Sequence, residues 1–207
     1  MQLIQLIIDG VASGCIYGLV ALGFVLIYKA TETINFAQGD ILMLGAFVAF
    51  SLIGVLGMNY IVGFILTVMI IAVFGFFLDA VVVRQIIGQP AFATVMLTIG
   101  LGFIFRGFAS IYWGTDIFSF STPFSGKITE VGGLIISYVN ISIIVGTTLL
   151  MGILFAFFSF TKIGVAMRAS SENQLAAYYM GIPVKFIFSL IWSISAGVAA
   201  IAGVLLA

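Results

Sequence analysis

The stretch Tyr60–Leu78 reads YIVGFILTVMIIAVFGFFL and contains no charged residue. The hydrocarbon core of a bilayer is about 30 Å thick, and a helix of roughly 20 apolar residues crosses it. The stretch therefore predicts one membrane-spanning helix. Five further stretches have a similar apolar character, namely Val11–Tyr28, Ile41–Gly57, Ala91–Trp113, Leu134–Phe160 and Val184–Ala207. Because no stretch has the alternating pattern of membrane-barrel strands, we expect an all-α polytopic membrane protein with about six transmembrane helices.

The composition of the whole chain agrees with a membrane environment. Of its 207 residues, 63% are hydrophobic and only 7% are charged, whereas a soluble domain carries roughly a quarter charged residues. Too few charges are present to cover a surface that faces water, so lipid must be the solvent for most of the chain. We therefore expect residues 1–207 to form a single transmembrane domain in contact with membrane lipid.

Several classes of function are excluded by what the sequence lacks. The formal net charge is zero, and no run of basic residues offers a surface for nucleic acid. The sequence has no histidine and a single cysteine, Cys15, which excludes disulfides within the chain and sites built from histidine and cysteine ligands. It also has no G-x-x-x-x-G-K-[ST] phosphate-binding loop. We expect no catalytic residue, metal site or cofactor in this chain, and no enzymatic activity of its own.

The distribution of lysine and arginine predicts the orientation of the chain, because cytoplasmic loops carry an excess of basic residues. If the segment after the fifth span is cytoplasmic, Arg106 and Lys127 lie outside, and the other basic residues lie inside. These are Lys29, Arg84, Lys162, Arg168 and Lys185. We therefore place the N-terminus outside. Residues 2–9, which have a polar and an apolar face, either lie along the membrane surface or form the irregular start of the first span.

The segment Lys29–Asp40 (KATETINFAQGD) separates the first two spans and allows two interpretations. In the first it is an ordinary inner loop, and Asp40 caps the next helix by accepting backbone N–H bonds. In the second it is a broken helix at membrane depth beside a water-filled path, because its mixture of apolar residues, amides and glycine is not typical of a solvated loop. Non-helical backbone at that depth is tolerated only inside protein or beside such a path.

The segment Gly114–Gly133 follows the fourth span and is too long for a tight turn. It is rich in glycine, serine, threonine and phenylalanine. It is either an extracytoplasmic loop or a docking surface for an external partner, since three of its phenylalanines would be costly to leave in water. These are Phe118, Phe120 and Phe124.

The segment Thr161–Pro183 contains the signals of a short helix. Residues Ser171–Gln174 (SENQ) have the form of a capping box, in which the serine caps the helix and the glutamine reaches back. Gly181 then ends a helix of about nine residues, which is too short to span the membrane. It is either a solvated linker or, with Ala176 and Ala177 on one side, a helix that fits a groove on a partner.

These segments resemble the permeases of branched-chain amino acid importers of the ABC class. The string Ile34–Asp40 (INFAQGD), followed by Met43–Ala46 (MLGA), is a specific pattern of that family. Further similar stretches, which together cover most of the chain, are Gly18–Gly23, Leu26–Tyr28, Pro90–Phe92, Thr98–Leu101, Arg106-Gly107 and Gly164–Gly181. The resemblance implies a permease subunit of an ATP-driven importer, which moves branched-chain amino acids or a related small polar solute across the bacterial inner membrane.

The resemblance also implies partners and functional residues. The partners would be ABC ATPase subunits, a second permease subunit (identical or related) and an extracytoplasmic solute-binding protein. The residues near the translocation path would be Asn35, Phe36, Gln38, Gly39, Asp40 and Thr98. The helix that couples the permease to the ATPase would include Arg168, Glu172, Asn173, Ala176, Ala177, Met180 and Gly181.

Two features depart from the family pattern. Leu175 stands where a glutamate often precedes the Ala176-Ala177 pair. Family members are also longer and have further spans after the one that ends at Ala207, so we expect this chain to be a shortened subunit or a C-terminally truncated one.

An ATP-independent carrier or channel for urea, an amide or an amino acid is the alternative function. Ion-coupled carriers place ionisable groups within their spans, whereas here we expect no acid in the middle of a span. Several ionisable residues instead fall at or near predicted span ends, namely Asp9, Asp40, Asp79, Arg84 and Lys185. This pattern counts against proton coupling and leaves a channel open. A purely structural role would leave the patterns at Asn35–Asp40 and Arg168–Gly181 unexplained.

Overall fold

The computed structural model describes residues 2–86, 89–116, 118, 120, 122, 123, 128–131 and 134–207. Within these ranges six helices are long and apolar enough to cross a membrane. They are α1 (Gln2–Thr31), α2 (Gln38–Ala49) with the π-helical turn Phe50–Val55 that continues it, α3 (Tyr60–Val81), α4 (Ala91–Tyr112), α5 (Tyr138–Phe160) and α8 (Val184–Leu206). The predicted all-α polytopic fold is therefore confirmed.

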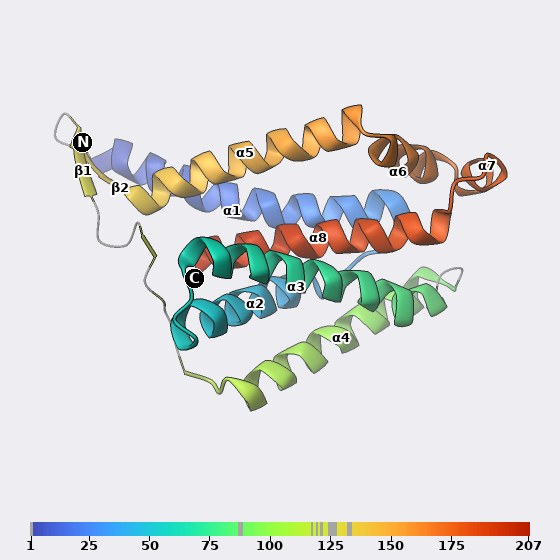
Figure 1. Ribbon diagram of the computed structural model, residues 1–207, viewed down its shortest axis with the longest axis horizontal. Helices are drawn as coiled ribbons and strands as arrows, with labels where there is room; N and C mark the ends of the chain where they lie inside the picture. Colours follow the sequence, from blue (N-terminus) through green and yellow to red (C-terminus); the bar gives the residue numbers. More distant parts are fainter. Residues whose placement is uncertain are drawn as a thin grey trace.

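Shorter elements join these helices at the two ends of the bundle (Figure 1). A 3₁₀ turn, Val83–Ile86, follows α3, and the helices α6 (Lys162–Glu172) and α7 (Gln174–Tyr179) lie between α5 and α8. Before α5, the strands β1 (Ile128–Val131) and β2 (Leu134–Ser137) form a small antiparallel hairpin in which Ile128 is paired with Ser137. This hairpin is too small to change the fold class.

Helix α8 lies in the middle of the bundle and packs against α1, α2 and α3 (Figure 1). Two-thirds of its most hydrophobic window, 67%, is buried, whereas the same fraction is 17–33% in the other five spans. Its small residues allow this close packing. A Cβ atom at Gly203 would lie 2.4 Å from the carbonyl oxygen of Leu42, and one at Gly45 would lie 2.7 Å from the Cα of Ala200. Helices α2 and α8 are therefore in contact at backbone distance.

The two ends of the bundle differ in charge. The N-terminus, the C-terminal end of α8 and the hairpin lie at one end, and α6 and α7 lie at the other (Figure 1). The predicted inner residues Lys29, Arg84 and Lys185 lie on elements that reach the α6–α7 end, and Lys162 and Arg168 belong to α6 itself. The predicted clustering of basic residues at one end is therefore present in the fold.

One basic residue does not lie where the orientation argument placed it. Arg106 lies inside α4, six residues before the helix ends at Tyr112, and its side chain reaches an acid on α2 rather than the outer solution. Lys127, the other residue assigned to the outside, falls outside the described residues.

Two span boundaries also differ from the sequence-based expectation. The helix α1 is continuous from Gln2, so residues 2–9 are the start of the first span and not a separate surface segment. The helix α5 begins at Tyr138 rather than Leu134, because Leu134–Ser137 pairs as a strand and the Ser137 side chain then accepts a hydrogen bond from the Val139 N–H. The second and third spans are separated at Gly57, whose φ is +65°, and at Asn59, which caps α3.

Candidate translocation path and coupling helix

The segment 32–37 is non-helical and enters the bundle. It begins at Glu32, whose φ of +54° lies in the left-handed region, which is uncommon for a residue other than glycine. It is followed by Gln38, the first residue of α2, whose Nε2 lies 3.4 Å from the carbonyl oxygen of Ser195. Ser195 is the twelfth of the 23 residues of α8. Helix α2 therefore begins beside the middle of α8, which favours the interpretation as a broken helix over that of an ordinary inner loop.

A hydrogen-bonded polar shell holds this backbone in place. Asn35 is 1% exposed and Gln38 is 3% exposed. The Asn35 side chain donates to Gln38 Oε1 (3.2 Å) and accepts from the Ala37 N–H (3.1 Å). Ser195 Oγ donates to the carbonyl oxygen of Gly23 on α1 (2.7 Å) and lies 3.2 Å from Gln38 Oε1. Because polar groups at this depth are costly unless paired, these contacts fix the two amides in one arrangement.

Thr98 on α4 joins the same segment from the other side. Its hydroxyl oxygen lies 3.3 Å from the backbone nitrogen of Phe36, from which it accepts, and 3.3 Å from the carbonyl oxygen of Ile34. Phe36 is 53% exposed. Gly39 is also exposed, and no atom lies within 4 Å of the position that a Cβ would occupy there. Of the predicted path residues, the structure thus brings Asn35, Gln38 and Thr98 together around segment 32–37, while Phe36 and Gly39 present outward surfaces.

Asp40 does not cap α2, contrary to one sequence-based interpretation. Ala37 precedes the helix and provides no side-chain cap, and Asp40 is the third helical residue. Its carboxylate instead forms an ion pair with Arg106, with Arg106 Nε to Asp40 Oδ1 at 2.6 Å and Nη2 to Oδ2 at 3.5 Å. The lack of a side chain at Gly102 makes room for the carboxylate, because a Cβ there would lie 2.4 Å from Asp40 Oδ2.

Asp40 lies near the start of its span, as expected, but its ion pair reaches the interior of another span. This span is α4, in which Arg106 is the sixteenth of 22 residues. Arg106 and Ser195 were missed as site residues. An arginine within an apolar helix was the signal for Arg106, whereas nothing in the sequence around Ser195 distinguishes it from the other small residues of α8.

A cavity of about 520 Å³ lies between segment 32–37 and α7, at the α6–α7 end of the bundle. Its wall includes Thr33 and Ile34 of the non-helical segment, Thr94 of α4 and Gln174 of α7. Thr94 and Thr98 are one helical turn apart, and Gly102 and Arg106 continue the same face of α4. This face of α4 therefore runs from the cavity to the ion pair.

The predicted short helix is present, but its start differs from the prediction. Ser171 lies within α6, where its hydroxyl donates to the Arg168 carbonyl oxygen (2.8 Å), and it caps nothing. Asn173 breaks the chain between α6 and α7 with φ −154° and ψ 102°, and its side chain accepts from the Ala176 N–H at 2.9 Å. Because Asn173 takes the cap position, α7 has six residues rather than about nine.

The predicted stop at Gly181 is confirmed. Gly181 has a φ of +80°, and the N–H of Ile182 donates to the carbonyl oxygen of Ala177 (3.0 Å) while that of Gly181 donates to Tyr178 (3.0 Å). This pair of hydrogen bonds is a Schellman motif, which satisfies the last carbonyls of the helix.

The surface of the predicted coupling helix differs from the expected one. Ala176 is exposed, but Ala177 is only 4% exposed, so the two alanines do not share an outward face. Tyr179 and Met180 are 80% and 82% exposed at the end of α7. Among the other predicted coupling residues, Arg168, Glu172 and Asn173 are exposed. The outward surface of the predicted coupling helix is thus formed mainly by Tyr179 and Met180, together with Ala176.

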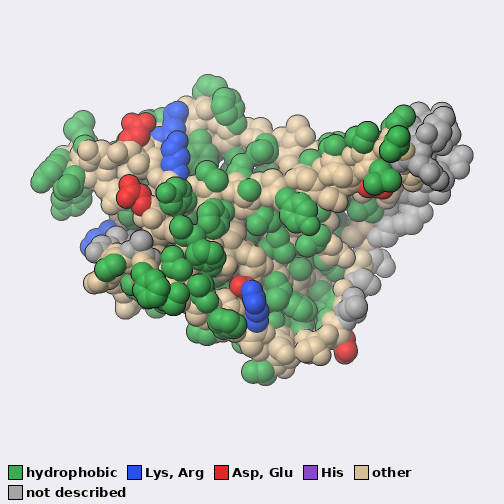
Figure 2. All heavy atoms as spheres, turned by 180° about the vertical axis from the view of Figure 1, so that it is seen from behind, with side chains coloured by type: hydrophobic (Ala, Val, Ile, Leu, Met, Phe, Trp, Pro, Cys, Tyr) green, Lys and Arg blue, Asp and Glu red, His purple; other side chains and the backbone are tan. Residues whose placement is uncertain are grey.

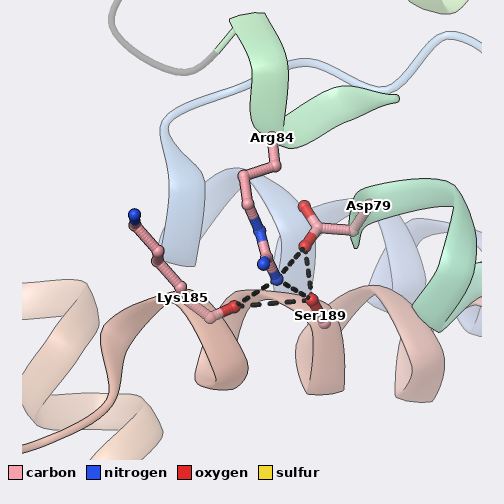
Figure 3. Close-up of polar contacts among 4 residues, drawn as sticks. All are labelled: Asp79, Arg84, Lys185 and Ser189. Carbon is pink, nitrogen blue, oxygen red and sulfur yellow. Dashed lines mark hydrogen bonds and ion pairs between the residues drawn. The ribbon is translucent and has the colours of Figure 1, made fainter. Parts of the chain in front are cut away.

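A second polar cluster, which sequence reasoning missed, ties the end of α3 to α8 (Figure 3), and Arg84 and Lys185 of this cluster line a cavity together with Tyr178 of α7. Asp79 is fully buried, and its Oδ2 accepts from Ser189 Oγ (2.6 Å) and lies 3.5 Å from Arg84 Nη2. Arg84 Nη2 also donates to the carbonyl oxygen of Lys185 (2.9 Å) and to Ser189 Oγ (2.5 Å). The Lys185 ammonium points away from the cluster (Figure 3).

Two of the three phenylalanines considered for an external docking surface pack against their own chain. Phe120 is 8% exposed and packs with Ala49 and Val204. The Phe118 ring lies 4.7 Å from that of Phe50. Phe124 falls outside the described residues. Phe118 and Phe120 therefore cover the C-terminal ends of α2 and α8 of their own chain.

Comparison with known proteins gives a consistent result. Residues 6–207 match the model of a family described as branched-chain amino acid transport system / permease component. The chain is 27% identical over 215 residues to the high-affinity branched-chain amino acid transport system permease protein BraD of Pseudomonas aeruginosa, covering 98% of this chain and 70% of that protein. It is 28% identical over 218 residues to LivH of Salmonella typhimurium, with the same description, covering 100% and 71%. No solved structure gives a significant match.

Proposed function

This chain belongs to the family of branched-chain amino acid transport system permease components, and on that premise we propose that it is a transmembrane subunit of an ATP-driven importer. The importer moves branched-chain amino acids, or a related small polar solute, across the inner membrane. The chain supplies the path and no chemistry. ATP hydrolysis takes place in separate ATPase subunits, and an extracytoplasmic binding protein delivers the solute.

The observation that carries this proposal is the start of α2 beside the middle of α8. Substrate sites of transporters lie near the membrane midplane where helices are discontinuous, because such breaks expose backbone polar groups to the solute. Here the break at segment 32–37 is lined by Asn35, Gln38 and Thr98, whose side chains are all buried. If this break faced lipid, its polar backbone groups would have no partners. The buried position of segment 32–37 therefore supports a translocation path enclosed by protein.

The position of α7 supports coupling to an ATPase. Its first residue, Gln174, lies in the wall of the cavity that also contains Thr33 and Ile34. A force applied to the exposed end of α7, at Tyr179 and Met180, therefore reaches the wall next to the non-helical segment through a helix of only six residues. Nucleotide-driven closure of the ATPase would change the shape of this cavity and release the solute inward.

The orientation follows from the same assignment. With α7 in the cytoplasm, the basic residues at the α6–α7 end satisfy the rule that inner loops are positively charged, and the N-terminus lies outside. A second permease subunit, identical or related, completes the path. It would cover faces of α4 that are apolar and exposed, such as those at Phe103 and Phe92.

The test is purification of the tagged chain in mild detergent, followed by identification of co-purifying subunits and reconstitution in liposomes. We expect ATPase subunits to be recovered and leucine uptake to require ATP. Tyr179→Arg should abolish recovery of the ATPase subunits, whereas Tyr112→Arg, which changes an exposed tyrosine at the opposite end of the bundle, should not. A chain that purifies alone and moves leucine or urea without ATP would instead be a carrier or channel.

A further inference from the structure

The ion pair between Asp40 and Arg106 lies near the middle of the bundle. Asp40 is two residues after Gln38, which contacts the middle residue of α8. Arginine side chains on a helix point back toward its N-terminus, so the Arg106 guanidinium lies deeper than its Cα, away from the outer end of α4. Among the described residues, the other ion pair, between Asp79 and Arg84, is at the α6–α7 end, where Arg84 lines a cavity together with Tyr178 of α7.

The two partners differ in exposure. The Asp40 side chain is 7% exposed and lies under the guanidinium, whereas the Arg106 side chain is 65% exposed. Its surroundings on α4 are apolar, with Phe103 67% and Phe108 55% exposed. Seen from behind, the middle of the molecule shows one basic side chain beside an acidic one in a surface with few other charges (Figure 2). Charged groups at this depth face protein or water and not lipid, so this part of α4 borders a polar space.

The surrounding polar groups are already engaged. The amides of Asn35 and Gln38 bond to each other, and Thr98 bonds to the segment backbone. These groups keep the start of α2 rigid and are not free to bind a solute. The guanidinium, by contrast, contacts Asp40 through one edge, and it has five N–H donors in all. The groups at this depth that are able to exchange partners are therefore the two charged ones.

We propose that Asp40 and Arg106 form a binding station for a zwitterion, which rests on the importer function proposed above. The solute's ammonium takes the place of Arg106 on the Asp40 carboxylate, and the Arg106 guanidinium turns to bind the solute's carboxylate. In the bound state the charges alternate in the order Asp40 carboxylate, solute ammonium, solute carboxylate and Arg106 guanidinium, so each of the four charged groups has an opposite partner. In a low-dielectric site this balance matters, because an isolated charge there is strongly unfavourable.

The station would discriminate by charge and not by side-chain size. A molecule with both an ammonium and a carboxylate replaces both halves of the ion pair. An uncharged amide such as urea replaces neither half, and it would have to pass while the pair stays closed. The exposed apolar ring of Phe103 lies beside the station, with the guanidinium 5.9 Å from its centre. The geometry thus favours α-amino acids with apolar side chains over uncharged amides.

The experiment uses the importer complex with its ATPase subunits in liposomes, and measures the initial rate of ATP-dependent uptake of radiolabelled L-leucine. The double variant Asp40→Asn/Arg106→Gln removes both charges and keeps a hydrogen-bonding side chain at each position, with the glutamine Nε2 able to take the place of the Arg106 Nε that contacts Asp40. A purely structural tie between α2 and α4 would survive this change and leave uptake near that of the wild type. The station predicts uptake lower by at least about tenfold, because charged contacts to the solute are lost.

Controls separate the possible outcomes. Asp40→Glu/Arg106→Lys keeps both charges but changes the length and shape of both side chains, so its uptake should fall below that of the wild type and stay above that of the neutral double variant. Asp9→Asn/Lys162→Gln removes one acid and one base at exposed positions away from the station and should not change uptake. Wild-type-like leucine uptake in the neutral double variant would overturn the station while leaving the importer intact. Absence of ATP-dependent leucine uptake by the wild type would overturn the importer function itself.

Discussion

Gln38, the first residue of α2, places its amide nitrogen 3.4 Å from the backbone carbonyl oxygen of Ser195, the twelfth residue of α8. This contact joins the beginning of one span to the middle of another. Ser195 in turn donates to the carbonyl oxygen of Gly23 on α1, so three helices meet at one buried polar point. The broken segment 32–37 is held at this depth because each of its polar neighbours has a partner.

The contact depends on the absence of a side chain at Gly23. A Cβ at this position would lie 2.4 Å from Gln38 Nε2 and 3.3 Å from the Ser195 carbonyl oxygen. In Gly23→Ala we expect the Gln38 side chain to be displaced and its hydrogen bonds to be lost, at a cost of about 1 kcal/mol for each bond. Leucine uptake by the reconstituted complex should fall several-fold. Gly18→Ala on the same helix, where no atom lies within 4 Å, should transport normally.

The spans were predictable from the sequence because apolar length alone determines them. Tyr60–Leu78 and Val184–Ala207 have too few charges to lie in water, and both are helices that cross the bundle, α3 and α8, within a few residues of the predicted bounds. The stop at Gly181 was predictable for a similar reason, since a local backbone conformation that favours glycine requires no knowledge of the rest of the fold.

The contacts that define the site were not predictable in this way. Asp40 and Arg106 are 66 residues apart, and Asp79 and Ser189 are 110 apart. Pairing at such separations is decided by how the helices pack, which a single sequence does not contain.

The start of α7 was missed for a different reason. Ser171 and Asn173 are both good capping residues, and the choice between them depends on the extended backbone at Asn173.

Close packing of α2 on α8 predicts the effect of a second glycine substitution. A Cβ at Gly203 would lie 2.4 Å from the backbone carbonyl oxygen of Leu42, which has no side-chain freedom to move aside. Gly203→Ala should therefore push the two helices apart and lower the thermal unfolding midpoint of the purified protein. Gly146→Ala in α5 has no atom within 4 Å. Since alanine is the better helix former by about 1 kcal/mol, that control should keep or raise the midpoint.

The cluster of Asp79, Arg84 and Ser189 predicts a difference between single and double variants. Arg84→Met leaves the fully buried Asp79 carboxylate without its ion-pair partner, and an uncompensated buried charge is destabilising by about 3–5 kcal/mol. Because the Arg84 side chain is 32% exposed, we expect a loss at or below the lower end of this range. Asp79→Leu/Arg84→Met removes both charges and should be more stable than Arg84→Met alone. A double variant whose thermal midpoint is lower than that of Arg84→Met would contradict this account.

The left-handed backbone at Gly181 allows a test of coupling in which no residue of α7 itself is replaced. Gly181 has a φ of +80°, and a non-glycine residue in the left-handed region costs about 1–2 kcal/mol, more for a β-branched one. Gly181→Val should therefore disturb the Schellman motif and the position of α7, so that ATP hydrolysis continues while leucine uptake falls. Asparagine adopts the left-handed region more readily than valine, so leucine uptake should fall less in Gly181→Asn than in Gly181→Val. The measurement is the number of leucine molecules imported per ATP hydrolysed. An equal ratio in the wild type and both variants would mean that this turn does not transmit the motion of the ATPase.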